Sequence, residues 1–223
     1  MSLDRASCQV RVPADGSSPE LTLEARFDLP GPDGTNDDAV AGAGAVVAPP
    51  HPVYGGTLAN SVVSAAAEGL RRAGIATLLF NYRGTEASEG QLTDSLEAAA
   101  RDYQAALAEL RTRAPGPNLA AGYSFGAGVA LLATRDDPRI KGAVLIAPPL
   151  GMLRAEDLTA FSGRLLVIVG DDDDYAPVPE LTARLAVRPD AVLDVIPGAD
   201  HFFHFGGLAA ISARVAEHVR GWL

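Results

Sequence analysis

The sequence is poor in cysteine, in lysine and in positive charge generally. These shortages exclude an internal disulfide and argue against a broad basic surface. Its single cysteine, Cys8, cannot form an internal disulfide, so nothing in the chain requires an oxidising compartment. It also lies far from any histidine in the sequence, and we assign it no function. Lys141 is the only lysine, and 18 basic against 28 acidic residues give a formal charge of −10. We therefore expect no broad basic face for nucleic acid or an anionic membrane.

Long apolar runs are missing as well. No stretch approaches the roughly 18 consecutive apolar residues that a membrane-spanning helix needs. The first residues, "MSLDRASCQV", lack the basic segment followed by an apolar segment that is typical of a secretory signal. We therefore expect a cytoplasmic protein. A chain of 223 residues, 48% of them hydrophobic, can bury one large core, so we expect a single domain over residues 1–223.

What the chain does contain, from residue 44 onward, is a regular alternation of apolar runs and helical patterns. The runs predict strands, and they cover residues 44–49, 75–82, 118–123, 140–148, 163–170 and 191–197. Helices are predicted at about 58–73, 92–113, from 125, 178–187 and 208–222. Apolar strands that alternate with helices predict an α/β fold, with a mostly parallel sheet covered on both faces. In such sheets the functional residues gather just after the strands, at the carboxyl edge.

The segments outside this alternation have different patterns. The opening residues and the stretch 21–29 alternate by two, which predicts antiparallel strands at one edge of the sheet. The polar, turn-rich stretch 30–38 predicts a hairpin tip. Residues 148–163 are long enough for only a small, partly apolar flap, so we expect no large cap.

The stretch "AAGYSFGAG", residues 120–128, places a serine between glycines directly after a predicted strand. A Gly-x-Ser-x-Gly sequence between strand and helix is typical of a nucleophile elbow, whose sharp turn lifts the serine hydroxyl clear of the sheet. Side chains at positions 122 and 126 would collide across that turn, which explains Gly122 and Gly126. Gly128 is expected to let the helix lie close on the sheet. The motif is short enough to occur by chance, and a glycine-rich loop with Ser124 as a helix cap is the alternative.

A serine hydroxyl is a poor nucleophile unless a base removes its proton, and the chain has four histidines to consider, His51, His201, His204 and His218. His218 lies among polar residues in the last predicted helix, which indicates a surface position. His201 follows the strand 191–197 and precedes an aromatic run, so we favour it as the base over His204. Phe202, Phe203 and Phe205 are expected to pack this loop down and not to bind substrate.

The base must itself be oriented by an acid. Four aspartates, residues 171–174, directly follow the strand 163–170, and one of them is the predicted partner of His201. The others are expected to face water. Contiguous aspartates lack the alternating spacing of a calcium loop, so we predict no metal site.

An acyl-transfer reaction also needs backbone N–H groups in place for the developing oxyanion. One is expected from Phe125, which follows the serine. The second is expected from the loop "PPHPVYGG", residues 49–56. The prolines in this loop have no N–H, so His51 carries the only backbone donor among them. The alternative is a proline-rich turn without a catalytic role.

Taken together, these residues resemble the α/β-hydrolase superfamily, and most closely its small, cap-free branch with a His-Pro…Gly-Gly loop. The resemblance runs from about residue 44 to the end, through "PPHPVYGGTLANSVV", "FNYRGTEASEG", "GYSFGAG", "GDDDDYAP" and "GADHFFH". It implies an α/β-hydrolase fold with Ser124 as nucleophile and His201 as base. The acid of the family lies three residues after the glycine that ends its strand, which implies Asp173, with Asp174 as the fallback.

The same resemblance makes the backbone N–H groups of His51 and Phe125 the oxyanion donors, and Arg83 a structural anchor. The sequence departs from the pattern at two positions. Pro49 stands where relatives have the first histidine of the His-Pro loop, and Glu86 stands where they often have a second glycine. Both departures leave the shape of the loops around the serine open.

These residues indicate a serine hydrolase that cleaves esters or thioesters of small to medium acyl groups through an acyl-enzyme, without a cofactor. The expected partner is a small-molecule substrate, and the sequence does not indicate the substrate-binding residues or an oligomeric state. An amidase, a peptidase or an acyltransferase could use the same triad. A binding protein that keeps the fold without turnover is the alternative from a different class.

Overall fold

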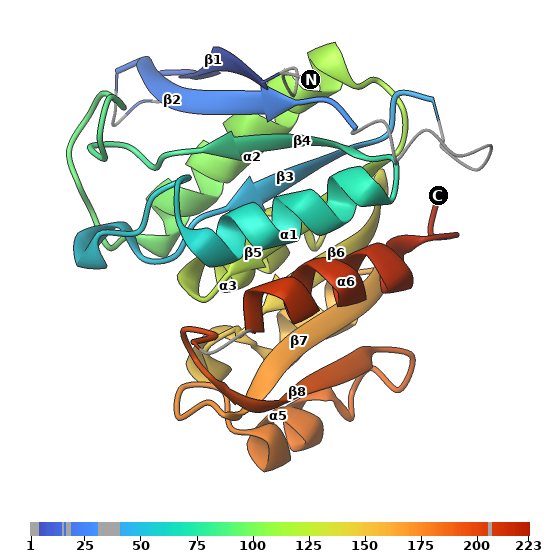
Figure 1. Cartoon of the computed structure of the whole chain (residues 1–223). Coiled ribbons are helices and arrows are strands. Elements are labelled where there is room, and N and C mark those ends of the chain that lie inside the picture. Colours follow the sequence, from blue (N-terminus) through green and yellow to red (C-terminus); the bar gives the residue numbers. More distant parts are fainter. Residues whose placement is uncertain (1–4, 15, 17–18, 31–40, 205–206) are drawn as a thin grey trace.

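The computed structural model describes residues 5–14, 16, 19–30, 41–204 and 207–223 (Figure 1). Eight strands form one sheet in the order β1-β2-β4-β3-β5-β6-β7-β8. β1 pairs with β2 and β2 with β4 in antiparallel register, and every later pair is parallel. The strands are β1 (Arg5–Val12), β2 (Leu21–Asp28), β3 (Gly44–Ala48), β4 (Ala76–Phe80), β5 (Asn118–Tyr123), β6 (Ile140–Ile146), β7 (Arg164–Asp172) and β8 (Val192–Asp200).

Helices cover both faces of the sheet, because its central strands are apolar on both sides. The helices are α1 (Ser61–Arg72), α2 (Leu96–Arg113), α3 (Phe125–Thr134), α4 (Ala155–Ala160), α5 (Val178–Leu185) and α6 (Gly207–Val219). α1 and α6 lie side by side on one face, and α2 and α3 cover the other together with α4 and α5 (Figure 1). All residues of β3, β4 and β5 are buried, as expected for strands between two helical layers. The predicted fold class is therefore confirmed.

α1 and α2 each begin where a polar side chain caps the first turn. Asn60 accepts hydrogen bonds from the N–H groups of Val62 and Val63, so α1 begins at residue 61 and not at the predicted 58. Ser95 caps α2 in the same way, through a bond from the Ala98 N–H. Within the residues that the structure describes, no helix is both long and apolar enough to cross a membrane.

The segments at the margins differ in part from the prediction. The antiparallel pairing of the first two strands is as expected. Of these two strands β1 lies at the edge of the sheet, whereas β2 lies between β1 and β4. The predicted hairpin tip at 30–38 falls almost entirely outside the described residues. The stretch 148–163 is not a flap, because Leu153, Leu158 and Phe161 are buried in the core beside α4 and hold it against the sheet. The described residues form no large cap.

Candidate active site

Ser124 lies in a sharp turn between β5 and α3, at the carboxyl edge of the sheet. Its φ of 52° and ψ of −120° are unusual for a residue other than glycine. A Cβ on Gly122 would lie 2.1 Å from the carbonyl oxygen of Gly126, and one on Gly126 would lie 2.4 Å from that of Pro49. Both glycines are therefore required by the closeness of the backbone. The serine is half-buried, since the turn raises it above the strands.

Gly128 has a different role from the one predicted. A Cβ at this position would meet the side chain of Met152, whose Cε would lie 2.6 Å away. The space that Gly128 leaves is thus filled by the 3-10 turn Leu150–Met152 and not by the sheet.

The structure brings together three of the predicted side chains, from the ends of three strands. Nε2 of His201 lies 3.0 Å from Oγ of Ser124, and Nδ1 lies 2.8 Å from Oδ2 of Asp173. Because a carboxylate only accepts hydrogen bonds, Nδ1 carries the proton of the neutral imidazole. Nε2 is then free to accept the serine proton, which is the tautomer that a general base needs.

Asp173 is held in place by the chain that follows it. Its Oδ1 accepts bonds from the backbone N–H groups of Tyr175 and Ala176, at 2.8 and 3.0 Å. It is the one buried member of the four aspartates, while Asp171, Asp172 and Asp174 are exposed. The register of β7 against β8 shifts between Gly170 and Asp172, so the strand ends irregularly just before the carboxylate. Asp174, the fallback, is not in contact with His201.

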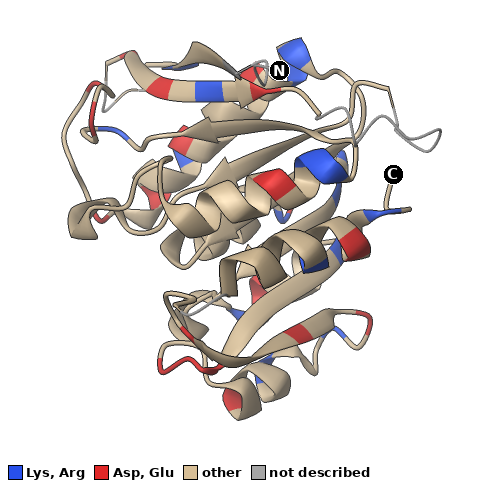
Figure 2. Ribbon diagram, viewed as in Figure 1, with Lys and Arg blue, Asp and Glu red and all other residues tan. Residues whose placement is uncertain are grey.

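Figure 2 shows that the loop after β7 carries acidic residues without basic ones beside them. The surface next to His201 is therefore negative. Among the residues described, no three acidic, histidine or cysteine side chains are grouped so as to hold a metal ion.

His201 is surrounded by aromatic rings. The Tyr123 hydroxyl donates to the backbone carbonyl of His201 at 3.0 Å, and burial raises the pKa of this hydroxyl, which keeps it a donor. The ring of Tyr175 lies 4.6 Å from the imidazole and that of Phe202 lies 5.4 Å away, edge to face. Phe203 is buried and packs the loop down, as predicted. For Phe202 the prediction is wrong, because the residue is 55% exposed and does not pack into the core. Phe205, the third ring, lies outside the described residues.

The other two C-terminal histidines lie apart from the serine. The His204 side chain is exposed, and its Nδ1 lies 2.7 Å from Oδ2 of Asp200. His218 lies at the surface, half-buried, and its Nε2 is 2.8 Å from Oδ2 of Asp194, a contact that links α6 to β8.

The loop after β3 lies directly beside the serine turn. The ring centroids of His51 and Phe125 are 4.4 Å apart, so the two residues predicted to supply the oxyanion donors are neighbours in space. The loop is closed by bonds from the N–H groups of Tyr54 and Gly56 to the His51 carbonyl, both at 3.1 Å. Burial lowers the pKa of the His51 imidazole, whose Nδ1 accepts a bond from the Val53 N–H. The Phe125 N–H belongs to the first turn of α3, where N–H groups have no partner within the helix.

The loop after β4 keeps a glycine-like shape despite Glu86. Glu86 has a φ of 48°, in the left-handed region that glycine adopts most easily. Arg83 is anchored as expected, through a buried ion pair at 2.6 Å with Asp102 of α2. Asn81, which the sequence analysis did not single out, accepts a bond from the Leu58 N–H and so ties the segment after the His51 loop to the end of β4. Its only sequence signal is a polar residue at the end of an apolar strand.

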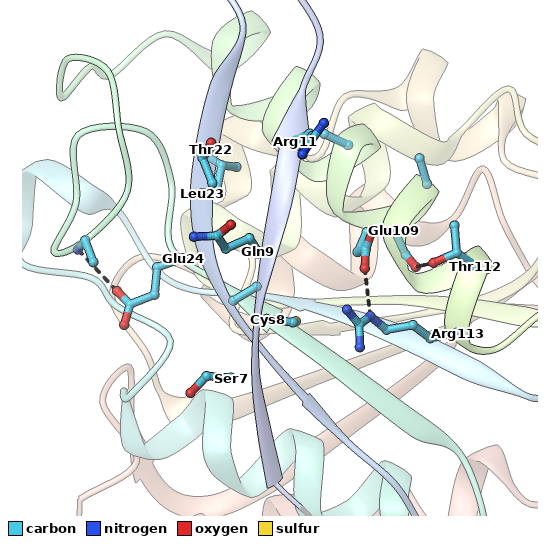
Figure 3. Close-up of a pocket in the computed structure, with 14 residues that line it drawn as sticks. Ser7, Cys8, Gln9, Arg11, Thr22, Leu23, Glu24, Glu109, Thr112 and Arg113 are labelled. Atoms are coloured by element: carbon cyan, nitrogen blue, oxygen red, sulfur yellow. Dashed lines mark hydrogen bonds and ion pairs between the residues drawn. The ribbon is translucent and has the colours of Figure 1, made fainter.

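A groove of about 860 Å³ between β1, β2 and α2 contains none of the candidate residues (Figure 3). Two of its charged residues, Glu109 and Arg113, form an ion pair with each other at 2.7 Å. Cys8 lines the groove, and burial raises the pKa of its thiol, which disfavours the reactive thiolate. This groove therefore does not compete with the Ser124 site.

Comparison with known proteins finds relatives of the same fold. XC6422 from Xanthomonas campestris, described as an α/β serine hydrolase without a lid, is 30% identical; the alignment covers 100% of this chain and 97% of that one, with a TM-score of 0.82. A Coxiella burnetii α/β serine hydrolase homologue shares the fold, with 23% identity, coverage of 98% and 99%, and a TM-score of 0.81. The uncharacterized protein RP471 of Rickettsia prowazekii is 31% identical over 172 residues, 72% of each chain.

The fold and these relatives define a member of the α/β-hydrolase superfamily, in its branch without a cap. Residues 55–170 match the model of the family described as serine aminopeptidase, S33, and the chain belongs to this hydrolase family.

Proposed function

We propose that the protein is a serine hydrolase that cleaves esters of small to medium acyl groups through an acyl-enzyme. Ser124 is the nucleophile, His201 the general base and Asp173 the acid that orients it. The observation that carries the proposal is the continuous path from Ser124 Oγ to His201 Nε2, at 3.0 Å, and from His201 Nδ1 to Asp173, at 2.8 Å. Both distances are within the range that proton transfer requires.

In the proposed reaction His201 takes the proton of Ser124 as Oγ attacks the substrate carbonyl. The negative charge that develops on the carbonyl oxygen is stabilised by the backbone N–H groups of His51 and Phe125. The imidazolium then returns its proton to the leaving oxygen, and the acyl group stays on Ser124. Water, deprotonated by His201, releases the acid and restores the serine.

The choice of small to medium acyl groups is supported by the absence of a lid among the described residues. The stretch 148–163 is fixed in the core, so the described residues provide no lid over a long lipid chain. Thioesters of the same acyl size are accessible to the same chemistry.

A second candidate is hydrolysis of an amide or peptide bond, favoured by the description of the matching family as a serine aminopeptidase. Nitrophenyl esters of increasing acyl length, assayed beside nitroanilides with the same acyl groups, separate the two. Cleavage of the anilides with no cleavage of any ester would replace the first proposal by the second.

Labelling by a fluorophosphonate tests whether Ser124 is an activated nucleophile. We expect the wild-type protein to be labelled and Ser124→Ala to lose both labelling and ester hydrolysis, with a decrease in kcat of about 10⁴- to 10⁶-fold. Ser7→Ala removes an exposed serine on β1 and is the matched control, which should label as the wild type does. A folded wild-type protein that is not labelled would contradict the proposal.

A further inference from the structure

A hollow beside His201 has no part in the reaction as described so far. Its volume is about 450 Å³, within the range of about 300–1,000 Å³ that small-molecule sites occupy. The rings of Tyr123, Phe202 and Phe203 line it together with His204, and Asn60 and Ser61 line it at the start of α1. His201 does not line the hollow itself but lies behind the rings of Tyr123 and Phe202.

The three rings connect the hollow to the imidazole. The ring centroids of Tyr123 and Phe202 lie 5.7 and 5.4 Å from that of His201, and Phe203 packs edge to face on Tyr123 at 6.4 Å. Phe203 and Tyr123 are buried, whereas the side chain of Phe202 is half-exposed. An exposed phenylalanine in this position offers a surface on which a second aromatic ring can stack.

The chemistry of the site decides which part of the substrate reaches this hollow. His201 must give its proton to the oxygen of the leaving alcohol, so that oxygen lies next to Nε2 in the proposed reaction. The substituent of the alcohol then extends away from Ser124, along the aromatic rings next to His201. The acyl group stays bonded to Oγ, on the side of the His51 loop.

The charge of the surroundings limits the leaving group further. Asp171, Asp172 and Asp174 are exposed on the neighbouring loop, and His204, which lines the hollow, has its Nδ1 2.7 Å from Oδ2 of Asp200, so that acidic groups outnumber the one basic group there. A leaving group that carries phosphates or carboxylates would be repelled, while a neutral aromatic alcohol would not.

We propose that Phe202 and this hollow form a leaving-group subsite for arylalkyl alcohols, such as benzyl alcohol; the inference rests on the proposed function. When the tetrahedral intermediate collapses, the bond between the acyl carbon and the alcohol oxygen breaks. The proton on His201 Nε2 passes to that oxygen, and the neutral alcohol leaves through the hollow. In the reverse direction the same alcohol attacks the acyl-enzyme, so it should compete with water as an acceptor.

The test uses three butyrate esters that share one acyl-enzyme, the benzyl, cyclohexylmethyl and ethyl esters. Benzyl and cyclohexylmethyl alcohols are similar in size and apolar but differ in acidity, so the change in the ratio of their kcat/KM values between the wild type and Phe202→Ala isolates aromatic stacking. We expect the wild-type enzyme to favour benzyl over cyclohexylmethyl butyrate by roughly two- to tenfold, the size of an aromatic pair interaction. Phe202→Ala should lower this ratio by about two- to tenfold and retain the ethyl ester as a substrate.

Tyr54→Ala is the matched control. Tyr54 is also an exposed aromatic residue, but its ring contacts His51, at 4.9 Å, and not His201. This variant should leave the benzyl-to-cyclohexylmethyl ratio as in the wild type. Ser61→Phe places a ring inside the hollow from an exposed helix start, and it should reduce kcat/KM for benzyl butyrate more than for ethyl butyrate.

The outcomes separate this proposal from the one on which it rests. Ester hydrolysis that depends on Ser124 but shows no preference for benzyl butyrate would overturn the subsite alone. The subsite would also be overturned if Phe202→Ala slowed all three esters equally, as a structural role predicts. A protein that hydrolyses none of the esters and is not labelled at Ser124 would overturn the proposed function.

Discussion

Two histidine–aspartate pairs involve histidines only three residues apart, His201 and His204. The pairs share the same chemical groups but differ in burial and in what lies next to the imidazole. His201 and Asp173 are buried, 2.8 Å apart, and their contact continues to Ser124. His204 and Asp200 are 2.7 Å apart, but their side chains are 61% and 36% exposed. A histidine bonded to a carboxylate is thus not enough to mark a catalytic pair. What distinguishes the first pair is exclusion of water and a third group within reach of Nε2.

The largest difference between the pairs is expected on removal of the imidazole. His201→Ala removes the base and should lower kcat by about 10⁵- to 10⁶-fold. His204→Ala removes an exposed pair, of the kind that contributes little, and should change kcat by less than about threefold. Steady-state assays on one short ester measure both. If His204→Ala proved as inactive as His201→Ala, the assignment of the base would be wrong.

Substitution of the two aspartates should also lower kcat more in the buried pair than in the exposed pair, but by less than substitution of His201 does. Asp173→Asn keeps the shape of the side chain but favours the wrong imidazole tautomer, so kcat should fall by about 10³- to 10⁴-fold. Asp200→Asn should lower it by less than about threefold. Circular dichroism of both variants serves as the control for folding. Near-normal turnover by a folded Asp173→Asn would show that the carboxylate does not orient the base.

The smallest effect concerns stability in acid. The hydrogen bond from His204, together with the positive charge of its ring, holds the pKa of Asp200 below its ordinary value. A lowered pKa stabilises the folded state above the unfolded value, near 4, and the contribution is lost as the pH falls through the folded value. The free energy of unfolding of Asp200→Asn, measured in urea between pH 6 and 3, should therefore decline less steeply than that of the wild type. The prediction would be contradicted if the free energy of unfolding fell equally steeply with pH in both proteins, or if the two proteins differed in their pH dependence only near neutral pH.

Much of the fold follows from periodicity. The apolar runs predicted the parallel strands, and the glycine spacing around Ser124 predicted the turn, because both depend on residues near in sequence. The resemblance pointed to Asp173 among four adjacent aspartates. Periodicity alone could not choose it, since a shift of register after Gly170 decides which carboxylate turns inward. That shift is a property of the pairing between β7 and β8.

Other features depend on contacts between distant segments, which no local pattern contains. Burial of Leu153, Leu158 and Phe161 turned an expected flap into part of the core. Gly128 makes room for Met152, a residue of a separate segment. The exposure of Phe202 beside the buried Phe203 depends on which side of the loop faces α1, and two adjacent phenylalanines do not show this in sequence.

The close backbone contacts at Gly122 and Gly126 also limit which substitutions the turn around Ser124 can accept. Where even a methyl group at position 122 or 126 would touch backbone oxygen, substitution has almost no freedom. Tyr54, Tyr175 and Phe202 have no such restriction, since each is mostly open to solvent. Substitutions at these three exposed positions can therefore change the surroundings of the site without disturbing the backbone around Ser124.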